Sequence, residues 1–161
     1  MYKRQQKYDA AAQTFDRSLQ LVATSTLSQE IKDNAKLLHH FNLAGLAIAR
    51  KDYAAAKTHG DEFRQGAEAS KNPVQLKQSH ELAGRIALAR KDCGLAISEL
   101  EQANQQDPRN LYRLGQAYQG KGDSGEAQKY FAKAASFNSL PALNYAFVRA
   151  KAQKMASGGK A

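Results

Sequence analysis

The sequence predicts an all-α protein, built as an α-solenoid of antiparallel helix pairs. Alanine supplies 29 of the 161 residues, whereas Ile, Val and Thr together supply 11, and this balance favours helix over strand. The tripeptide Leu-Ala-Gly occurs at residues 43–45 and again at 82–84, and the tetrapeptide Ala-Arg-Lys-Asp follows both copies within a few residues. The three prolines stand 35 and 33 residues apart, close to the period of about 34 residues of helix–turn–helix repeats.

The first two predicted helices flank a polar loop. Apolar residues at positions 11, 15, 19 and 22 recur at helical spacing and predict a helix over about residues 6–22. The stretch Thr-Ser-Thr at 24–26 is the clearest loop in the chain. Thr26 and Gln29 have the spacing of a capping box, so we expect them to start a long helix over about residues 27–50.

An aspartate begins the second helix of each later pair. Asp52, Asp92 and Asp123 are each followed four residues later by alanine, and an aspartate side chain can accept the backbone N–H groups that a helix start leaves unpaired. The predicted pairs are 27–50 with 53–70, 74–90 with 93–106, and 109–121 with 124–136, and a last helix follows over about residues 140–154.

Small residues stand where paired helices must cross. Gly115 is expected to face Ala127 of the next helix, while Phe131 fills the layer behind them. Gly84 has the equivalent place one repeat earlier. Such small side chains would let two helix backbones approach closely, so the fold should depend on them.

The pattern of residues 108–141 resembles the tetratricopeptide repeat, in which a bulky residue, Leu-Gly, Tyr, a Gly-Asp-Tyr turn, Ala, Phe, Ala and Pro follow in order. The positions that match are Leu111, Leu114, Gly115, Tyr118, Gly122, Asp123, Ala127, Phe131 and Ala134. Ser124 replaces the aromatic turn residue, and Pro141 comes two positions late. Looser copies lie at 77–108 and 37–73. The resemblance implies a right-handed superhelix of stacked helix pairs.

The same resemblance divides the chain into segments. Residues 1–23 look like the orphan second helix of a truncated repeat, so we expect the sequence to be a fragment that starts mid-repeat. The segments that follow are expected to be three repeats at 27–73, 74–107 and 108–139, a C-terminal capping helix at 140–155 and a disordered tail at 156–161.

Charge and hydropathy exclude several classes of protein. The net charge is +9, and residues 108–161 carry 9 basic and 2 acidic side chains, so an anionic partner should meet that end. The longest apolar run, 43–49, is far shorter than the roughly 20 residues of a membrane-spanning helix, and no signal-peptide pattern opens the chain. We therefore expect a soluble protein without membrane insertion. Cys93 has no intramolecular partner, which leaves the compartment open.

Two motifs suggest chemistry that their context does not support. Residues 120–125 spell G-x-G-x-x-G, a dinucleotide-binding fingerprint, but they join two helices instead of a strand and a helix, so they predict a turn. The four histidines, at 39, 40, 59 and 80, have no Cys or carboxylate at ligand spacing and are expected to be packing residues. We expect no cofactor, no metal and no enzymatic activity.

The resemblance implies a concave peptide-binding groove lined by the first helix of each pair. Its predicted lining residues are Phe41, Ile48, Glu81, Arg85, Leu88, Arg109, Tyr112, Arg113, Gln116 and Gln119. Arg109 and Arg113 stand one turn apart beside Tyr112, where they could bind an acidic peptide. We expect both arginines to be removable with little change in the melting temperature. An ordinary solvated helix face is the plainer interpretation of these residues.

These observations favour a non-catalytic protein–protein interaction scaffold that binds an extended peptide or helix. The alternative is a basic helical-repeat module that contacts nucleic acid, although the sequence lacks a base-reading repeat pattern and carries 13 acidic residues in positions 1–107. A third interpretation is the structural repeat segment of a larger enzyme or regulator. Neither the partner nor the oligomeric state follows from the sequence.

Overall fold

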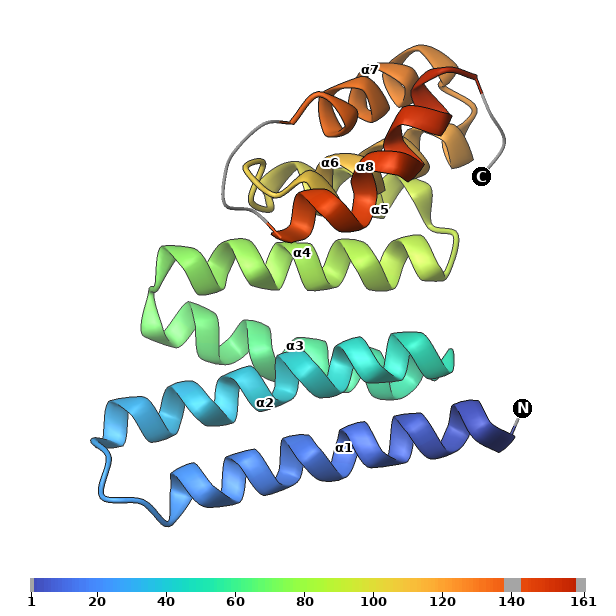
Figure 1. Ribbon diagram of the computed structural model, residues 1–161. Coiled ribbons are helices and arrows are strands. Elements are labelled where there is room, and N and C mark those ends of the chain that lie inside the picture. Colours follow the sequence, from blue (N-terminus) through green and yellow to red (C-terminus); the bar gives the residue numbers. More distant parts are fainter. Residues whose placement is uncertain (1, 138–142, 159–161) are drawn as a thin grey trace. The chain divides into compact units, whose positions relative to one another are not determined.

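The computed structural model describes residues 2–137 and 143–158, which form eight α-helices and no strand (Figure 1). The helices are α1 (Tyr2–Ala23), α2 (Gln29–Arg50), α3 (Tyr53–Ser70), α4 (Pro73–Ala89), α5 (Cys93–Gln102), α6 (Pro108–Lys121), α7 (Ser124–Ala135) and α8 (Leu143–Ala156). The all-α prediction is confirmed. Pro141, the start of the predicted capping helix and the end of the predicted tail lie outside the described residues.

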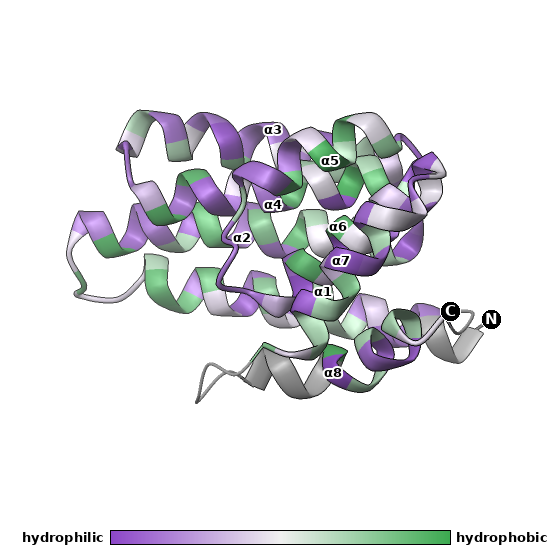
Figure 2. Cartoon of the chain, turned by 90° about the horizontal axis from the view of Figure 1, so that it is seen from above, coloured by the Kyte–Doolittle hydropathy of each residue, from purple (hydrophilic) through white to green (hydrophobic). Residues whose placement is uncertain are grey.

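The chain divides into two compact units, Met1–Leu82 and Ala83–Ala161, and α4 contributes to both. In the first unit α2 packs against α1 and α3; in the second, α6 packs against α5, α7 and α8, and α7 packs against α8. Helices that are neighbours in sequence are therefore neighbours in space within each unit, as in a helical repeat solenoid. Hydrophilic and hydrophobic residues alternate along the helices (Figure 2). No described helix is long and apolar enough to cross a membrane.

The same turn joins the paired helices in both units. Asp52, Asp92 and Asp123 each accept a backbone N–H three residues ahead, at 3.0, 3.2 and 3.1 Å, which confirms their role as helix caps. The residue before each aspartate is left-handed: φ is 64° at Lys51, 64° at Lys91 and 89° at Gly122. Gly122, within the G-x-G-x-x-G motif, therefore ends α6, and the motif is a helix–helix turn as predicted.

Several helix ends differ from the prediction: α1, for example, begins at Tyr2 instead of near residue 6. The cap of α2 is Ser28, which accepts the N–H of Ile31, so the predicted capping box of Thr26 and Gln29 is wrong. Ser25 instead accepts the N–H of Leu27 at 3.3 Å and keeps that stretch in the loop.

Helix α5 also ends earlier than predicted, at Gln102 instead of near residue 106. The side-chain amide of Gln105 donates to the backbone oxygens of Leu100 and Ala103, at 2.8 and 3.0 Å. These bonds satisfy carbonyl groups that the helix end leaves unpaired and so compete with continued helix.

Glycines allow the close packing of paired helices. A Cβ atom at Gly115 would lie 2.5 Å from Cδ1 of Phe131, and one at Gly84 would lie 2.6 Å from Cγ of Leu100. Phe131 is 2 % exposed and Leu100 is fully buried. The glycines therefore stand at tight helix contacts as predicted, but Gly115 lies directly against Phe131, which was expected to fill the layer behind, and Gly84 lies directly against Leu100.

Candidate functional site

Asp107 and Pro108 fix the start of α6, the helix that carries five of the ten predicted groove residues. The carboxylate of Asp107 accepts the backbone N–H of Arg109 at 2.8 Å and is only 8 % exposed. Pro108 occupies the first turn of α6, where its missing N–H costs no hydrogen bond. This Asp-Pro pair sets the position from which the side chains of α6 project.

Asp107 also holds the side chain of Arg109. The Nε group of Arg109 donates to both carboxylate oxygens at 3.1 Å, and Nη2 donates to Oδ2 at 2.6 Å. Such a forked pair is stronger and more directional than a single neutral hydrogen bond. The guanidinium is therefore held in one place at the surface of α6.

This pairing bears on the expectation that Arg109 and Arg113 can be removed with little change in the melting temperature. Removal of the guanidinium would leave the buried Asp107 carboxylate without this partner, and breaking a buried ion pair by deleting one member is destabilising. Arg109 is therefore part of the helix start as well as a candidate contact residue.

Arg113 is held by a second buried polar residue. Asn110 is fully buried, its Nδ2 donates to the backbone oxygen of Asn104 at 3.1 Å, and its Oδ1 accepts from Nη1 of Arg113 at 2.8 Å. Because the amide of Asn110 is fixed by the loop before α6, the position of Arg113 is fixed in turn. The two arginines are thus positioned from the interior of the repeat.

Tyr112, between the two arginines, is part of the packing of this unit. Its ring centroid lies 5.4 Å from that of Phe131, with an angle of 51° between the planes. The side chain is half-buried, and burial raises the pKa of the Tyr112 phenol. Tyr112 therefore ties α6 to α7, and its side chain stays partly exposed.

The ten predicted groove residues belong to different units. Phe41, Ile48 and Glu81 lie in the first unit; Arg85, Leu88, Arg109, Tyr112, Arg113, Gln116 and Gln119 lie in the second. Gln119 is exposed, Glu81 is buried, and the remaining eight are half-buried. Phe41 packs against Phe63 of α3 with ring centroids 5.2 Å apart. A continuous groove through all ten stays a prediction.

A pair of stacked tyrosines lies elsewhere on the second unit. The rings of Tyr118 and Tyr130 are 5.4 Å apart and nearly parallel, and the hydroxyl of Tyr118 donates to Glu101 at 2.9 Å. Burial and this bond raise the pKa of Tyr118 to about 12. Lys133 Nζ lies 5.0 Å from the centre of the Tyr130 ring. Tyr118 is one of the positions that match the repeat pattern, whereas the sequence indicated no role for Tyr130 or Glu101.

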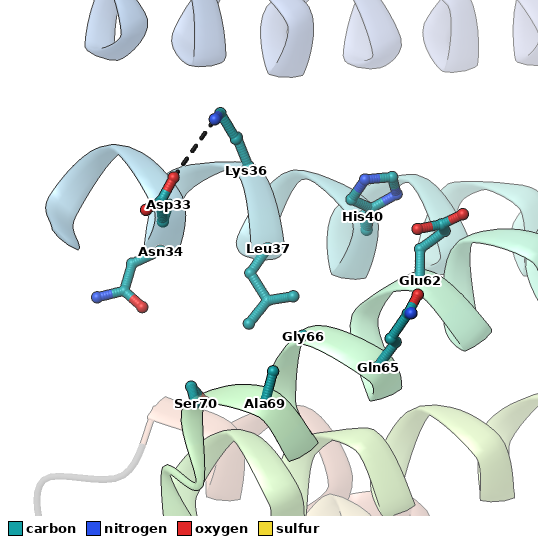
Figure 3. Close-up of a pocket in the computed structure, with 10 residues that line it drawn as sticks. All are labelled: Asp33, Asn34, Lys36, Leu37, His40, Glu62, Gln65, Gly66, Ala69 and Ser70. Carbon is teal, nitrogen blue, oxygen red and sulfur yellow. Dashed lines mark hydrogen bonds and ion pairs between the residues drawn. The ribbon is translucent and has the colours of Figure 1, made fainter. Parts of the chain in front are cut away.

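The first unit has a groove of about 450 Å³ between α2 and α3 (Figure 3). Its lining residues are Asp33, Asn34, Lys36, Leu37, His40, Glu62, Gln65, Gly66, Ala69 and Ser70. Leu37 points toward Gly66 across the groove, and Asp33 pairs with Lys36 at 3.3 Å. None of the predicted groove residues lines it, because helical periodicity does not show where two helices diverge.

The supporting residues of α6 were also missed. Asp107 stands before a proline, a combination that marks a helix start, so this dipeptide could have identified it. Asn110 gave no signal, because a polar residue on a helix is usually exposed. No group of three His, Cys, Asp or Glu side chains within the described residues could hold a metal ion.

Comparison with known protein families matches residues 108–139 to the tetratricopeptide repeat. No curated protein and no solved structure matches the chain. The matched segment contains α6 and α7, and thus both arginines and Tyr112.

Proposed function

The chain contains a tetratricopeptide repeat at residues 108–139, and on this premise we propose that it is a non-catalytic module that binds a peptide or helix of another protein. Stacked helix pairs form extended surfaces that repeat proteins use for binding. Fold alone does not identify a partner, so the proposal rests on the chemistry of α6.

The positioned arginines of α6 carry the proposal. Arg109 and Arg113 stand one helical turn apart, and the buried Asp107 and Asn110 hold them in place. An arginine that is already ordered loses less conformational entropy when it binds. A ligand carboxylate would accept charge-assisted hydrogen bonds from this pair, and an apolar ligand group would pack on Tyr112.

Charge favours an acidic ligand. Residues 108–161 carry 9 basic and 2 acidic side chains. Arg149, Lys151 and Lys154 are exposed on α8, which packs against both α6 and α7. Exposed charges contribute little by themselves, so the apolar part of the ligand must exclude water from the arginines for them to add affinity.

Selection from a library of displayed random peptides, with the full chain as target, tests this proposal. We expect the selected peptides to contain Asp or Glu. Arg113→Gln should weaken them roughly tenfold or more, because a hydrogen bond to a charged group contributes about 1.5–3 kcal/mol and each 1.4 kcal/mol is a factor of ten. Glutamine can still donate to Asn110, so the variant should fold.

Lys121→Gln is the matched control, because it removes the same charge from an exposed position two turns further along α6. It should change peptide binding less than about twofold, as is usual for an isolated surface charge. Selected peptides without acidic residues, or equal effects of the two substitutions, would contradict the proposed site.

The basic C-terminal segment supports nucleic acid as a second candidate ligand. The affinity for a labelled single-stranded oligonucleotide would then fall steeply with added salt. Arg113→Gln and Lys121→Gln would weaken oligonucleotide binding equally, because phosphate contacts depend on charge and not on one geometry. Binding of this kind, tighter than that of the selected peptides, would favour the second candidate.

A further inference from the structure

Three histidines of the first unit meet where α2 packs against α1 and α3. His40 of α2 and His59 of α3 approach through their Nδ1 atoms, which are 3.3 Å apart, and their ring centroids are 5.5 Å apart. Beside them, Nε2 of His39 lies 3.3 Å from Oδ1 of Asp16 on α1. The contact between His40 and His59 joins two helices through groups that change charge near neutral pH.

The approach of two Nδ1 atoms restricts how many protons the pair can hold. A hydrogen bond between them needs one ring to donate its N–H and the other to accept through a bare nitrogen. The bond forms when both rings are neutral, and it survives when one carries a positive charge. When both rings are charged, each Nδ1 carries a hydrogen, so two positive N–H groups would face each other.

We propose that the contact between His40 and His59 is a pH-sensitive latch between α2 and α3, closed while at least one ring is neutral and released when both are charged. The inference does not depend on the proposed peptide site. No group of three His, Cys, Asp or Glu side chains among the described residues here could hold a metal ion.

Charged groups around the pair set the pH at which the latch opens. Burial, followed by the charges of His40 and His39, lowers the pKa of His59, and Glu62 one turn further along α3 partly offsets this effect. From α1, Asp16 acts on His39 and not on the pair directly.

The remaining nearby charges come from the ends of α2 and α3. Arg50 and Asp52 line the same small pocket as His59, and Arg50 is paired with Asp9 of α1. On the His40 side, Lys36 lines the groove but is paired with Asp33. The two basic side chains are thus each paired with a carboxylate, whereas Asp52 accepts the backbone N–H of Ala55 as the cap of α3.

The sign of the effect follows from linkage. The pKa of His59 in the folded chain is lower than the value of about 6.5 expected when unfolded, so the unfolded chain binds more protons. The neutral His59 ring stabilises the folded chain above pH 6.5. This stabilisation is lost as the pH falls below 6.5 and through the pKa that His59 has in the folded chain. Acid should therefore loosen α2 from α3.

Packing on both sides of the latch keeps its opening local. Leu37, one turn before His40, packs toward Gly66, and Phe41 packs against Phe63, which is 1 % exposed. His40 also lines the groove of Figure 3, beside Glu62. Release would thus change the width and charge of that groove while the apolar contacts still join the helices.

Hydrogen exchange of the full chain at pH 7.5 and pH 5.0, corrected for the intrinsic exchange rates, tests the latch. In the wild type, the protection factors of residues 53–70 should fall on acidification. The fall should be up to tenfold for each unit by which the pKa of His59 in the folded chain lies below its unfolded value. His59→Asn should remove this fall, because a neutral amide can replace Nδ1 and cannot gain a proton. Equal loss of protection in the wild type and His59→Asn, or no loss in the wild type, would overturn the proposal.

His39→Gln is the matched control on the same helix. It removes the contact with Asp16 and the small contribution of the His39 charge to the lowered pKa of His59, but it leaves the contact between His40 and His59. The acid-dependent loss over 53–70 should therefore remain, somewhat reduced. An NMR titration of the wild type checks the proton count without any substitution. The His59 ring should take up its proton below pH 6.5, because burial and the charges of His40 and His39 lower its pKa. Protonation of His59 at or above pH 6.5 would also overturn the latch.

Discussion

The substitution Gly115→Ala tests the packing of α6 against α7 at its tightest point. The added Cβ would lie 2.5 Å from Cδ1 and 2.6 Å from Cε1 of Phe131, whereas ordinary carbon contacts are 3.4–4 Å. The ring cannot easily move away, because Phe131 is 2 % exposed and packs with Tyr112, Ala127 and Met155. We therefore expect the variant to fold with a strained contact between the two helices.

The magnitude follows from two opposing terms. Replacing glycine by alanine within a helix gains up to about 1 kcal/mol. Overpacking a buried site costs about 1–3 kcal/mol. Gly94→Ala in α5 provides the control, because the nearest atom to its added Cβ, Oδ1 of Asp92, is 4.0 Å away. The control should gain up to about 1 kcal/mol, and the difference between the two variants should be about 1–3 kcal/mol.

Urea denaturation followed by circular dichroism at 222 nm measures this difference. Gly115→Ala should be less stable than Gly94→Ala, and Gly115→Leu should be less stable than either. If Gly115→Ala were as stable as the control, Gly115 would not face Phe131 and the register of α6 against α7 would be wrong.

Three other measurements follow from the structure. Asp107→Asn keeps an oxygen to cap α6 but loses the ion pair with Arg109, so its free energy of unfolding in urea should fall by about 1 kcal/mol. Asp107→Ala should lose more, and equal stability of the wild type and both variants would refute the role given to this carboxylate. In an absorbance titration at 295 nm, the Tyr118 phenol should ionise with a pKa of about 12. Glu101→Gln should lower the pKa of Tyr118, and an unchanged pKa would show that the hydrogen bond to Glu101 has no effect on it. Hydrogen exchange should open residues 6–22 before 82–103, because none of the described side chains of α1 is fully buried, and equal protection would contradict this order.

The helices and their turns could be predicted because their signals are local. Asp52, Asp92 and Asp123 cap their helices through bonds that reach only three residues along the chain. Gly115 was recognisable because a repeated pattern placed it at a helix crossing. The cap of α2 was missed because Thr26 and Ser28 are both good caps, and only the path of the loop decides between them.

The details of the sites depend on contacts that are not local. His40 and His59 are 19 residues apart, and their approach follows from the rotation of α2 against α3, which the sequence pattern does not specify. Asn110 gave no signal of its burial, because a buried asparagine needs a partner such as the Asn104 carbonyl that only the folded loop provides. Arg109 was correctly placed on α6, but its pairing with Asp107 changes the expected effect of its removal on stability.

The most direct test of the proposed function is to locate a bound peptide on the chain. Hydrogen exchange of the full chain, with and without a saturating acidic peptide from the selection, reports which helix the peptide covers. We expect added protection over residues 108–121, centred on Arg109, Tyr112 and Arg113, and little change over 29–70. Added protection over 29–70 with none over 108–121 would place the ligand in the groove between α2 and α3 and would contradict the account of α6.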